Sequence, residues 1–401
     1  MRIVIAPDSF KGSMTAREAA EQIAAGVQEI WPDAECVRVP MADGGEGTVQ
    51  SLVDATGGRL ISRQVTDPLG RPITATFGVL GDGRTAIIEM AAASGLPLLS
   101  PRERDPLRAS TFGTGELLRA AREHSVSRII VGIGGSATND GGAGMLQALG
   151  GRLLDADGQD LPRGGAALAE LSRIDLSGIP ACLDDVDIVV ASDVDSPLTG
   201  PSGASRIFGP QKGATPDQIE QLEHALTHYA AVIRRDLGRD VEHAPGAGAA
   251  GGLGAGLMAF LGARFERGID LVIEHTRLDD AIAGADLVIT GEGSIDEQTR
   301  FGKTPYGVAQ AAARHGVPVI ALAGRVTADA AVLLDHGIDV VMPIVPSACS
   351  LEDALREGPT NLRTAAARAA RLLRLGGRVG ADRTVTAIAH RVSAIVRDDA
   401  E

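Results

Sequence analysis

The feature that most constrains the fold is a regular alternation of short apolar runs with amphipathic stretches near both ends of the chain. The run RIVIA (2–6) precedes an amphipathic stretch at 15–30, in which Thr15 and Glu18 have the spacing of a capping box. The same alternation returns later, with apolar runs at 285–290, 317–324 and 338–344 and amphipathic stretches at 305–315, 328–336 and 360–374. Strand–helix–strand order of this kind predicts a parallel sheet with helices on both faces.

The composition agrees with an α/β protein. Aromatic residues make up only 2% of the chain and hydrophobic residues 44%, so Ala, Val, Leu and Ile must build the core. The 51 glycines gather at the ends of apolar runs, where strand-to-helix turns are expected. A length of 401 residues is enough for two or three domains of about 100–200 residues each.

The middle of the chain predicts a second α/β domain that is inserted into the first. Its apolar runs are joined by longer and less regular segments, and they read TAIIEM (85–90), RIIVGIGG (128–135), GRLLDADG (151–158) and DIVVASDVDSPL (187–198). We therefore expect one domain from residues 1–78 and 285–376, an inserted domain from 79–284, and a C-terminal extension at 377–401.

Charge and cysteine usage argue against several classes of protein. The net charge of −14 disfavours nucleic acid as a partner. The three cysteines, Cys36, Cys182 and Cys349, form no CxxC or Cys/His cluster, as expected in a reducing cytoplasm. The long uncharged run at 246–263 is mostly Gly and Ala, so we expect a glycine loop leading into a buried helix and no contact with a membrane.

Lysine is rare, and its positions are informative. Only three of the 38 basic residues are lysine, namely Lys11, Lys212 and Lys303, and each is next to a glycine. Glycine lets the backbone approach a ligand closely, and a compact ammonium group is not equivalent to the planar fork of arginine. GKT at 302–304 is not a P-loop, because Glu297 stands where the motif needs glycine. We interpret these lysines as contacts to phosphate or carboxylate groups.

A glycine-rich loop, GIGGSATNDGGAG (132–144), follows a predicted strand. Its spacing matches a G-x-G-x-x-A dinucleotide fingerprint, but the later glycines keep the backbone irregular where a Rossmann helix should begin. Asp140 within the loop would repel a pyrophosphate unless a divalent cation lay between them. The loop therefore favours Mg-ATP, with backbone amides and the Ser136 and Thr138 hydroxyls as donors to phosphate.

Acidic residues also follow several predicted strands. In an open parallel sheet, ligands bind beyond the carboxyl ends of the strands. Carboxylates that hold Mg²⁺ and orient a hydroxyl, together with cations and amides for phosphate, are the groups that phosphoryl transfer requires. The acidic residues at these positions are Asp8, Asp43, Glu46, Asp193, Asp195, Glu292 and Asp296.

Several longer motifs resemble those of bacterial glycerate kinases of the GarK/GlxK type, the glycerate 2-kinases. The resemblance runs in order from residue 1 to about 376, and its motifs include IVIAPDSFKGS, ADGGEGT, TFGTGEL, GIGGSATNDGG, DVDSPL, FGPQKGA and ITGEGSIDEQT. It implies ATP-dependent phosphorylation of D-glycerate, with 2-phosphoglycerate favoured over 3-phosphoglycerate as the product. It also implies two α/β domains, one of them Rossmann-like and split in sequence, with in-line transfer in the cleft between them.

The resemblance and the chemistry of the residues together assign hypothetical roles. For the reaction itself, we expect Asp193 to act as the base and Lys212 or Lys303 to neutralise the transferred group. For binding glycerate, we expect Asp8, Ser9, Lys11, Asp43 and Glu46. For binding the nucleotide, we expect Gly134, Gly135, Ser136, Ala137, Thr138 and Glu292. For contacting Mg²⁺, directly or through water, we expect Asp195 and Asp296.

Two other functions stay open at this point. An NAD(P)-dependent hydroxy-acid dehydrogenase would rest on the fingerprint at 132–137 alone, and it would turn over without Mg²⁺. A non-catalytic sensor of glycerate or nucleotide would need a partner surface, which the sequence does not indicate. We expect small-molecule partners, D-glycerate and ATP, and leave a homodimer open.

Overall fold

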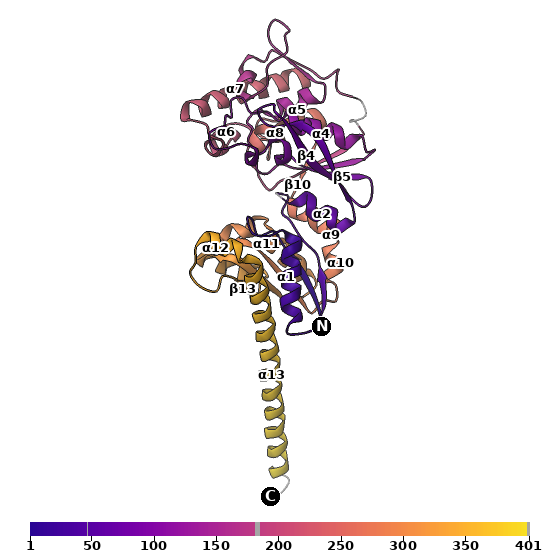
Figure 1. The fold of residues 1–401 in the computed structure, drawn as a ribbon, viewed down its shortest axis with the longest axis vertical. Helices are drawn as coiled ribbons and strands as arrows, with labels where there is room; N and C mark the ends of the chain where they lie inside the picture. Colours follow the sequence, from indigo (N-terminus) through magenta and orange to yellow (C-terminus); the bar gives the residue numbers. More distant parts are fainter. Residues whose placement is uncertain (46, 181–184, 399–401) are drawn as a thin grey trace. The chain divides into compact units, whose positions relative to one another are not determined.

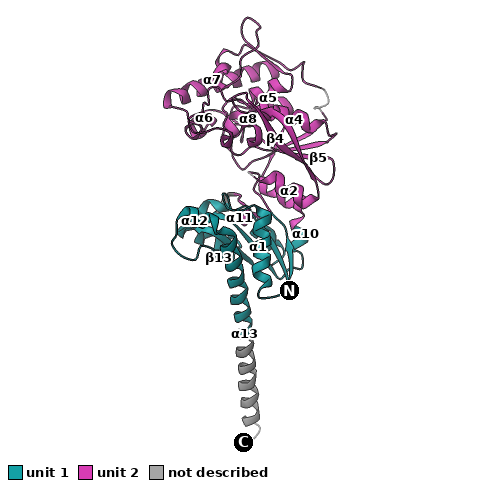
Figure 2. Cartoon of the chain, viewed as in Figure 1, with its two compact units in different colours: residues 1–40, 279–300, 308–401 teal, residues 41–278, 301–307 magenta. Residues whose placement is uncertain are grey.

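A computed structural model describes residues 1–45, 47–180 and 185–398, apart from the side chains of residues 301 and 380–398 (Figure 1). The chain forms two compact units, each of which has its own largely parallel sheet (Figure 2). Unit 1 consists of Met1–Pro40, Asp279–Arg300 and Val308–Glu401. Unit 2 consists of Met41–Leu278 and Phe301–Gly307.

Unit 1 contains a five-stranded sheet in the order β13-β12-β11-β1-β2, with all neighbours parallel. The strands are β1 (Arg2–Pro7), β2 (Glu35–Arg38), β11 (Leu287–Ile295), β12 (Val319–Val326) and β13 (Val340–Pro343). Strand β1 pairs with β11 from Ile3 opposite Leu287 to Pro7 opposite Gly291. The prediction of a parallel-sheet fold that is split in sequence is therefore confirmed.

Helices α1 (Ala16–Gln28) and α13 (Gly358–Asp398) pack against each other in unit 1. The predicted capping box at the start of α1 is present, with the Glu18 amide donating to Thr15 Oγ1. Small residues allow the two helices to approach closely: a Cβ on Gly26 would lie 2.2 Å from the carbonyl oxygen of Arg363. The aliphatic side chains of this interface join those of β1, β11 and β12 in one core.

Unit 2 contains a six-stranded sheet in the order β10-β9-β6-β5-β4-β3. The first four strands are parallel, and β4 and β3 are antiparallel additions at one edge. The strands are β3 (Arg59–Thr66), β4 (Pro72–Val79), β5 (Thr85–Glu89), β6 (Arg128–Gly132), β9 (Asp187–Ala191) and β10 (Arg264–Glu266), and β7 (Arg152–Leu154) pairs separately with β8 (Arg173–Asp175).

The contact-based units and the predicted domains divide the chain at different places. Residues 59–78 were expected in the first domain, but the hairpin of β3 and β4 pairs with β5 in the sheet of unit 2. The first exchange between units falls at Pro40–Met41, and a short segment, Phe301–Gly307, returns to unit 2. The predicted boundaries at 78/79 and 284/285 stay predictions about folding domains.

Helices pack against the sheet of unit 2, among them α2 and α4 on β3, β4 and β5. The uncharged run at 246–263 forms the buried helix α8, which begins with a non-helical turn at Ala250–Gly252, as expected for a glycine loop leading into a helix. No helix among the described residues is long and apolar enough to cross a membrane. The helices of this unit are α2 (Thr48–Thr56), α3 (Ala91–Ser94), α4 (Phe112–Arg122), α5 (Ala143–Ala148), α6 (Ala204–Phe208), α7 (Pro216–Leu237), α8 (Ala249–Leu261) and α9 (Gly268–Thr276).

The C-terminal half of unit 1 departs from expectation at β11, which continues to Ile295, so Glu292 lies within the strand and not in a loop after it. The helix expected at 328–336 is present with those bounds, as the 3-10 helix η6. The C-terminal extension is helical as far as Asp398 and continues α13 without a break. The other helices of this part are α10 (Leu278–Ile282), η5 (Glu297–Phe301), α11 (Thr304–Arg314) and α12 (Leu351–Arg356).

Candidate active site

The carboxyl ends of four parallel strands form a straight edge in unit 2. Glu89 of β5 lies opposite Gly132 of β6, Gly132 lies opposite Ala191 of β9, and Ala191 lies opposite Glu266 of β10. The segments that leave these strands include most of the unit 2 residues predicted to be functional. This edge is where an open parallel sheet binds its ligands.

The loop that carries Asp43 crosses this edge. A Cβ on Gly132 would lie 2.7 Å from the carbonyl oxygen of Gly44, and one on Gly268 would lie 2.0 Å from the carbonyl oxygen of Asp43. Gly44 itself has φ +91°, and a Cβ there would meet the backbone of Gly268 at 2.9 Å. Glycine at these positions therefore allows the Asp43 loop to lie directly on the ends of β6 and β10.

Asp193 is the most strongly perturbed carboxylate at this edge. Its Oδ1 lies 3.6 Å from Nε of Arg267, and 26% of its side chain remains exposed. Partial burial raises the pKa of Asp193 to about 6, Arg267 opposes that rise, and the charges of Asp43 and Asp270 add to it. A carboxyl group with a pKa near neutrality, on the binding edge of a sheet, has the properties of a general base.

The segment with Lys303 reaches the same carboxylate. Gly302 has φ +107°, and a Cβ on it would lie 3.0 Å from Cγ of Asp193. Lys303 follows this glycine directly, so the structure brings the predicted lysine segment beside the predicted base. Asp195 lies two residues after Asp193 and is exposed. Glu46, predicted to bind substrate, lies outside the described residues.

The predicted phosphate loop is only partly accessible. Gly134 and Gly135 are exposed, whereas Ser136, Ala137 and Thr138 are buried. The amide of Ala137 already donates to the carbonyl oxygen of Ser94 at 2.9 Å. Of the five residues predicted to contact phosphate, Gly134 and Gly135 are therefore the exposed ones, and the role itself stays a prediction.

Asp140 corrects one step of the sequence argument. Its carboxylate is fully buried and accepts hydrogen bonds from the Thr111 amide at 2.8 Å, the Thr111 hydroxyl at 3.0 Å, and the amides of Gly142 and Gly144 at 3.2 Å. It holds the starts of α4 and α5 together and has no exposed surface. Burial raises its pKa, while these four donors oppose the rise. The inference that Asp140 indicates a bridging cation was wrong.

Lys212 is also an interior residue. It ends the short 3-10 helix η4 (Pro210–Lys212), its side chain is 1% exposed, and its Nζ donates to the carbonyl oxygen of Thr138 at 2.6 Å. Burial lowers the pKa of Lys212 to about 7, and the charge of Asp140 opposes this effect. In this structure the buried ammonium group of Lys212 is hydrogen-bonded to the glycine loop, whereas it was predicted to contact the transferred group.

The dinucleotide fingerprint at 132–137 is not followed by the helix that it requires. After β6 the chain makes a turn at Gly134–Gly135, and α5 begins only at Ala143. A helix N-terminus therefore does not face the position where a pyrophosphate would bind. The geometry on which the dehydrogenase alternative rested is absent from this segment.

Unit 1 carries a second group of predicted residues at its own sheet edge. Asp8 follows β1, is 7% exposed, and its Oδ1 accepts from the Ser9 amide at 2.6 Å. A Cβ on Gly293 would lie 3.5 Å from the amide nitrogen of Lys11. The Asp8–Lys11 segment thus lies beside β11, where Glu292 Oε1 accepts from the Thr299 hydroxyl at 3.0 Å.

The two residues predicted to contact the metal are Asp195 and Asp296. Asp195 belongs to unit 2, whereas Asp296 belongs to unit 1 and accepts from the Gln298 amide at 2.9 Å at the start of η5. Among the described residues, no three His, Cys, Asp or Glu side chains gather closely enough to hold a metal ion. Single carboxylates of this kind fit Mg²⁺, which typically binds one or two protein carboxylates together with substrate phosphates and waters.

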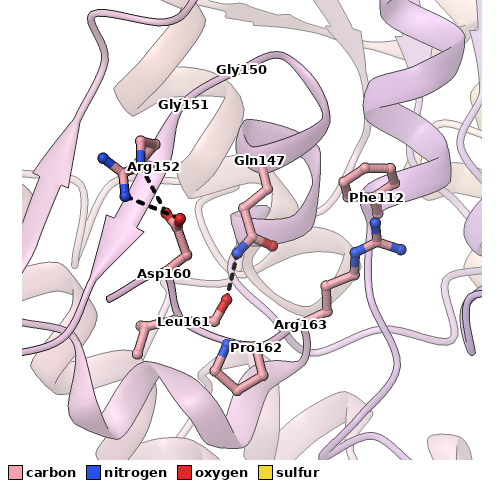
Figure 3. Close-up of a pocket in the computed structure, with 9 residues that line it drawn as sticks. All are labelled: Phe112, Gln147, Gly150, Gly151, Arg152, Asp160, Leu161, Pro162 and Arg163. Atoms are coloured by element: carbon pink, nitrogen blue, oxygen red, sulfur yellow. Dashed lines mark hydrogen bonds and ion pairs between the residues drawn. The ribbon is translucent and has the colours of Figure 1, made fainter. Parts of the chain in front are cut away.

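A cavity of about 550 Å³ lies elsewhere in unit 2 and contains none of the predicted site residues (Figure 3). Arg152 pairs with Asp160 across it, and the guanidinium of Arg163 lies 3.3 Å from the centre of the Phe112 ring. Gln147 donates to the carbonyl oxygen of Leu161 at 2.9 Å. Since its polar groups are largely engaged with one another, we assign it no part in the reaction.

Sequence reasoning missed two charged residues at the site. Arg267 and Asp270 follow β10, and the Arg267 Nε lies 3.8 Å from Oδ2 of Asp270. Strand β10 is three residues long and begins and ends with charged residues, so it leaves no apolar run to recognise. The only available signal was the segment RGID (267–270), in which glycine follows a cation and precedes a helix.

Comparison with known proteins places these features in a family. Residues 3–374 match the model of the glycerate kinase family. The chain is 55% identical to a glycerate kinase of Bacillus subtilis (strain 168), over 88% of this chain and 93% of that one. It is 51% identical to a glycerate 2-kinase of Escherichia coli (strain K12), over 94% and 99% of the two chains. A crystal structure described as glycerate kinase 2 from Salmonella typhimurium LT2 matches with a TM-score of 0.86 and 53% identity, over 94% and 99%.

Proposed function

The chain belongs to the glycerate kinase family and is an enzyme, and on that premise we propose that it transfers the γ-phosphoryl group of ATP to the 2-hydroxyl of D-glycerate. Mg²⁺ would accompany the nucleotide, as in other phosphoryl transfers. The observation that supports the chemistry best is the carboxyl group of Asp193, whose pKa is raised to about 6 beside Arg267 and Gly302.

Asp193 is proposed to orient the attacking hydroxyl and to accept its proton late in the reaction. Phosphoryl transfer passes through a loose transition state, so positioning and charge stabilisation matter more than early proton removal. A pKa of about 6 leaves the group mostly ionised at neutral pH while keeping it more basic than an ordinary aspartate. Lys303, next to Gly302, would neutralise charge on the transferred group.

The remaining roles are proposals about binding. Lys11 and Ser9 would bind the glycerate carboxylate, because an ammonium group and a hydroxyl suit a small anion. Asp8 and Asp43 would accept hydrogen bonds from the glycerate hydroxyls. The exposed backbone of Gly134–Gly135 would contact phosphate, since glycine lets a ligand approach the amides closely. Glu292 is retained as a nucleotide contact.

Bound Mg²⁺ would neutralise charge on the phosphates and orient them. Asp195 and Asp296 are the residues proposed to hold it, directly or through water. The expected cleft between the domains, a homodimer and a cytoplasmic location all stay predictions.

The substitution Asp193→Asn tests the proposed base. We expect kcat to fall by about 10²–10⁴-fold, the usual contribution of a general base. The matched control is Asp187→Asn at the other end of β9, where the carboxylate pairs with Arg128 and Arg264 at the surface. If kcat of Asp193→Asn stays within about tenfold of wild type, roughly 1.4 kcal/mol, the base role is refuted.

A further inference from the structure

We propose that Arg267 is a further catalytic residue, whose guanidinium binds the phosphoryl group during its transfer. The inference rests on the proposed function, because it takes Asp193 as the group that faces the attacking hydroxyl. It assigns a role to a residue that the sequence motifs did not indicate. Three independent observations support it: the place of Arg267 on the sheet, its unused donors, and its distance from Asp193.

Arg267 occupies the first position beyond the sheet edge. Glu266, the last residue of β10, is the register partner of Ala191, the last residue of β9. Arg267 therefore leaves its strand at the same level as Ser192, one residue before Asp193. Arg267 is also the N-cap residue of α9, with extended backbone at φ −65° and ψ 133°, and the close packing of Gly268 on Asp43 fixes the chain direction there.

The guanidinium of Arg267 is held by charge and retains its hydrogen-bonding capacity. Its Nε lies 3.6 Å from Asp193 Oδ1 and 3.8 Å from Asp270 Oδ2, and its side chain is 51% exposed. Both separations exceed an ordinary hydrogen bond. The Arg267 guanidinium thus makes two long ion pairs through Nε, with Asp193 and Asp270. The planar set of donors is thus available to an oxyanion, for which its fork geometry is suited.

The distance to Asp193 places this group beside the reaction. A hydroxyl that donates to Asp193 would lie about 2.7 Å from the carboxylate oxygen. The phosphorus atom that the hydroxyl attacks would lie about 3–3.5 Å beyond it. Because the Arg267 guanidinium lies 3.6 Å from the Asp193 carboxylate, it can reach the equatorial oxygens of the transferred phosphoryl group without leaving the site.

The charge balance of the edge also calls for such a cation. The carboxylates of Asp193 and Asp270 both lie within 3.8 Å of Arg267 Nε, and the backbone of Asp43 packs against Gly268, the next residue. These carboxylates repel an approaching phosphoryl group, and the guanidinium of Arg267 offsets part of that repulsion beside whatever charge Mg²⁺ neutralises. Lys212 and Lys303 were predicted to neutralise the transferred group, but Lys212 is buried and donates to the carbonyl oxygen of Thr138. Arg267 and Lys303 remain as cations that could neutralise that group.

The test compares Arg267→Met, Arg267→Lys and a control, Arg264→Met, in steady-state kinetics with D-glycerate and Mg-ATP. Arg264 begins the same strand and pairs with Asp187 at the opposite end. We expect Arg267→Met to lower kcat by about 10²–10³-fold with KM for both substrates within about threefold. Arg267→Lys should recover part of that loss, and Arg264→Met should stay within threefold of wild type.

Chemical rescue provides a readout that a purely structural role would not move. Guanidinium chloride at low millimolar concentration should raise the kcat of Arg267→Gly at least tenfold. It should leave the kcat of Arg264→Met unchanged. If Arg267→Met does not fold, as judged by its melting temperature, Arg267→Lys and the rescue of Arg267→Gly decide the question.

Three results would overturn the inference: a kcat of Arg267→Met within tenfold of wild type, a rise of KM at unchanged kcat, or no rescue of Arg267→Gly. The Asp193→Asn variant separates this failure from failure of the proposed function. If Asp193→Asn is inactive and Arg267→Met is active, only the role of Arg267 is refuted. If both variants are fully active, the proposed active site itself is refuted.

Discussion

Replacing the buried lysine beneath the glycine loop should stabilise the protein, and should do so more at low pH than at high pH. Lys212 is 1% exposed, and its Nζ has the Thr138 carbonyl oxygen as hydrogen-bond acceptor. Its pKa falls from 10.5 to about 7 in the folded protein, because burial disfavours the charged form. Lys212→Met removes that ammonium group and keeps an unbranched side chain of similar length.

The magnitude follows from the two pKa values. Below pH 7 the lysine is charged in both states, and the full burial penalty, roughly 5 kcal/mol, opposes folding. Between pH 7 and 10.5 the folded protein binds fewer protons than the unfolded chain, so wild-type stability rises with pH. At pH 9 about 2 kcal/mol of the penalty remains. The stability advantage of Lys212→Met should therefore shrink by about 3 kcal/mol from pH 6 to pH 9.

Urea unfolding followed by far-ultraviolet circular dichroism at pH 6 and pH 9 measures this change. The difference between the two pH values is the informative quantity, because the lost hydrogen bond to Thr138 and the altered surroundings of Asp140 shift both values together. Lys11→Met is the matched control, since Lys11 is exposed, and it should show no such difference. A stability difference between Lys212→Met and wild type that does not change with pH would refute the reasoning.

Three further predictions concern the reaction. The pKa of Asp193 is raised to about 6, so we expect kcat/KM to fall as the pH drops through about 6, because protonation removes the base. A pH–rate profile whose acidic limb lies near pH 4 would contradict this. Gly302→Ala should lower kcat at least tenfold and destabilise the protein by about 1–3 kcal/mol. The reason is that φ of residue 302 is +107° and the new Cβ would lie 3.0 Å from Asp193. A wild-type kcat would show that this contact has no consequence for the reaction. Chelation with EDTA should abolish turnover and added Mg²⁺ should restore it, whereas turnover in EDTA would exclude the metal from the reaction.

Local sequence rules predicted the elements whose signals are local. The alternation of apolar and amphipathic runs located β1, β11 and β12, and the Thr15 capping box located the start of α1. The hairpin of β3 and β4 could not be assigned to a unit from its own residues, because its place depends on the pairing of Val79 with Ala86 of β5. Strand β10 was missed because three residues carry no periodic pattern.

For the candidate site, the sequence indicated which types of residue stand at the strand ends, but it did not indicate what surrounds each side chain in the folded protein. The residue types at strand ends pointed correctly to the carboxyl edge of the sheet, where Asp43, Asp193 and the segment of Lys303 meet. The rarity of lysine did not show which lysines face solvent, so Lys212 was expected at a phosphate and lies in the core. Asp140 was misread because two of its four donors belong to Thr111, 29 residues away, and its burial appears only in the folded chain.

The central claim is that the enzyme phosphorylates the 2-hydroxyl of D-glycerate. Proton-coupled phosphorus NMR of the product formed from D-glycerate and Mg-ATP tests it most directly, because phosphorus on the 2-oxygen couples to one methine proton and phosphorus on the 3-oxygen couples to two methylene protons. We predict a doublet that grows as ADP accumulates, and that grows at least about a hundredfold more slowly with Asp193→Asn than with the wild type. A triplet would contradict the assignment of the hydroxyl, and ADP without any phosphorylated acid would contradict the claim itself.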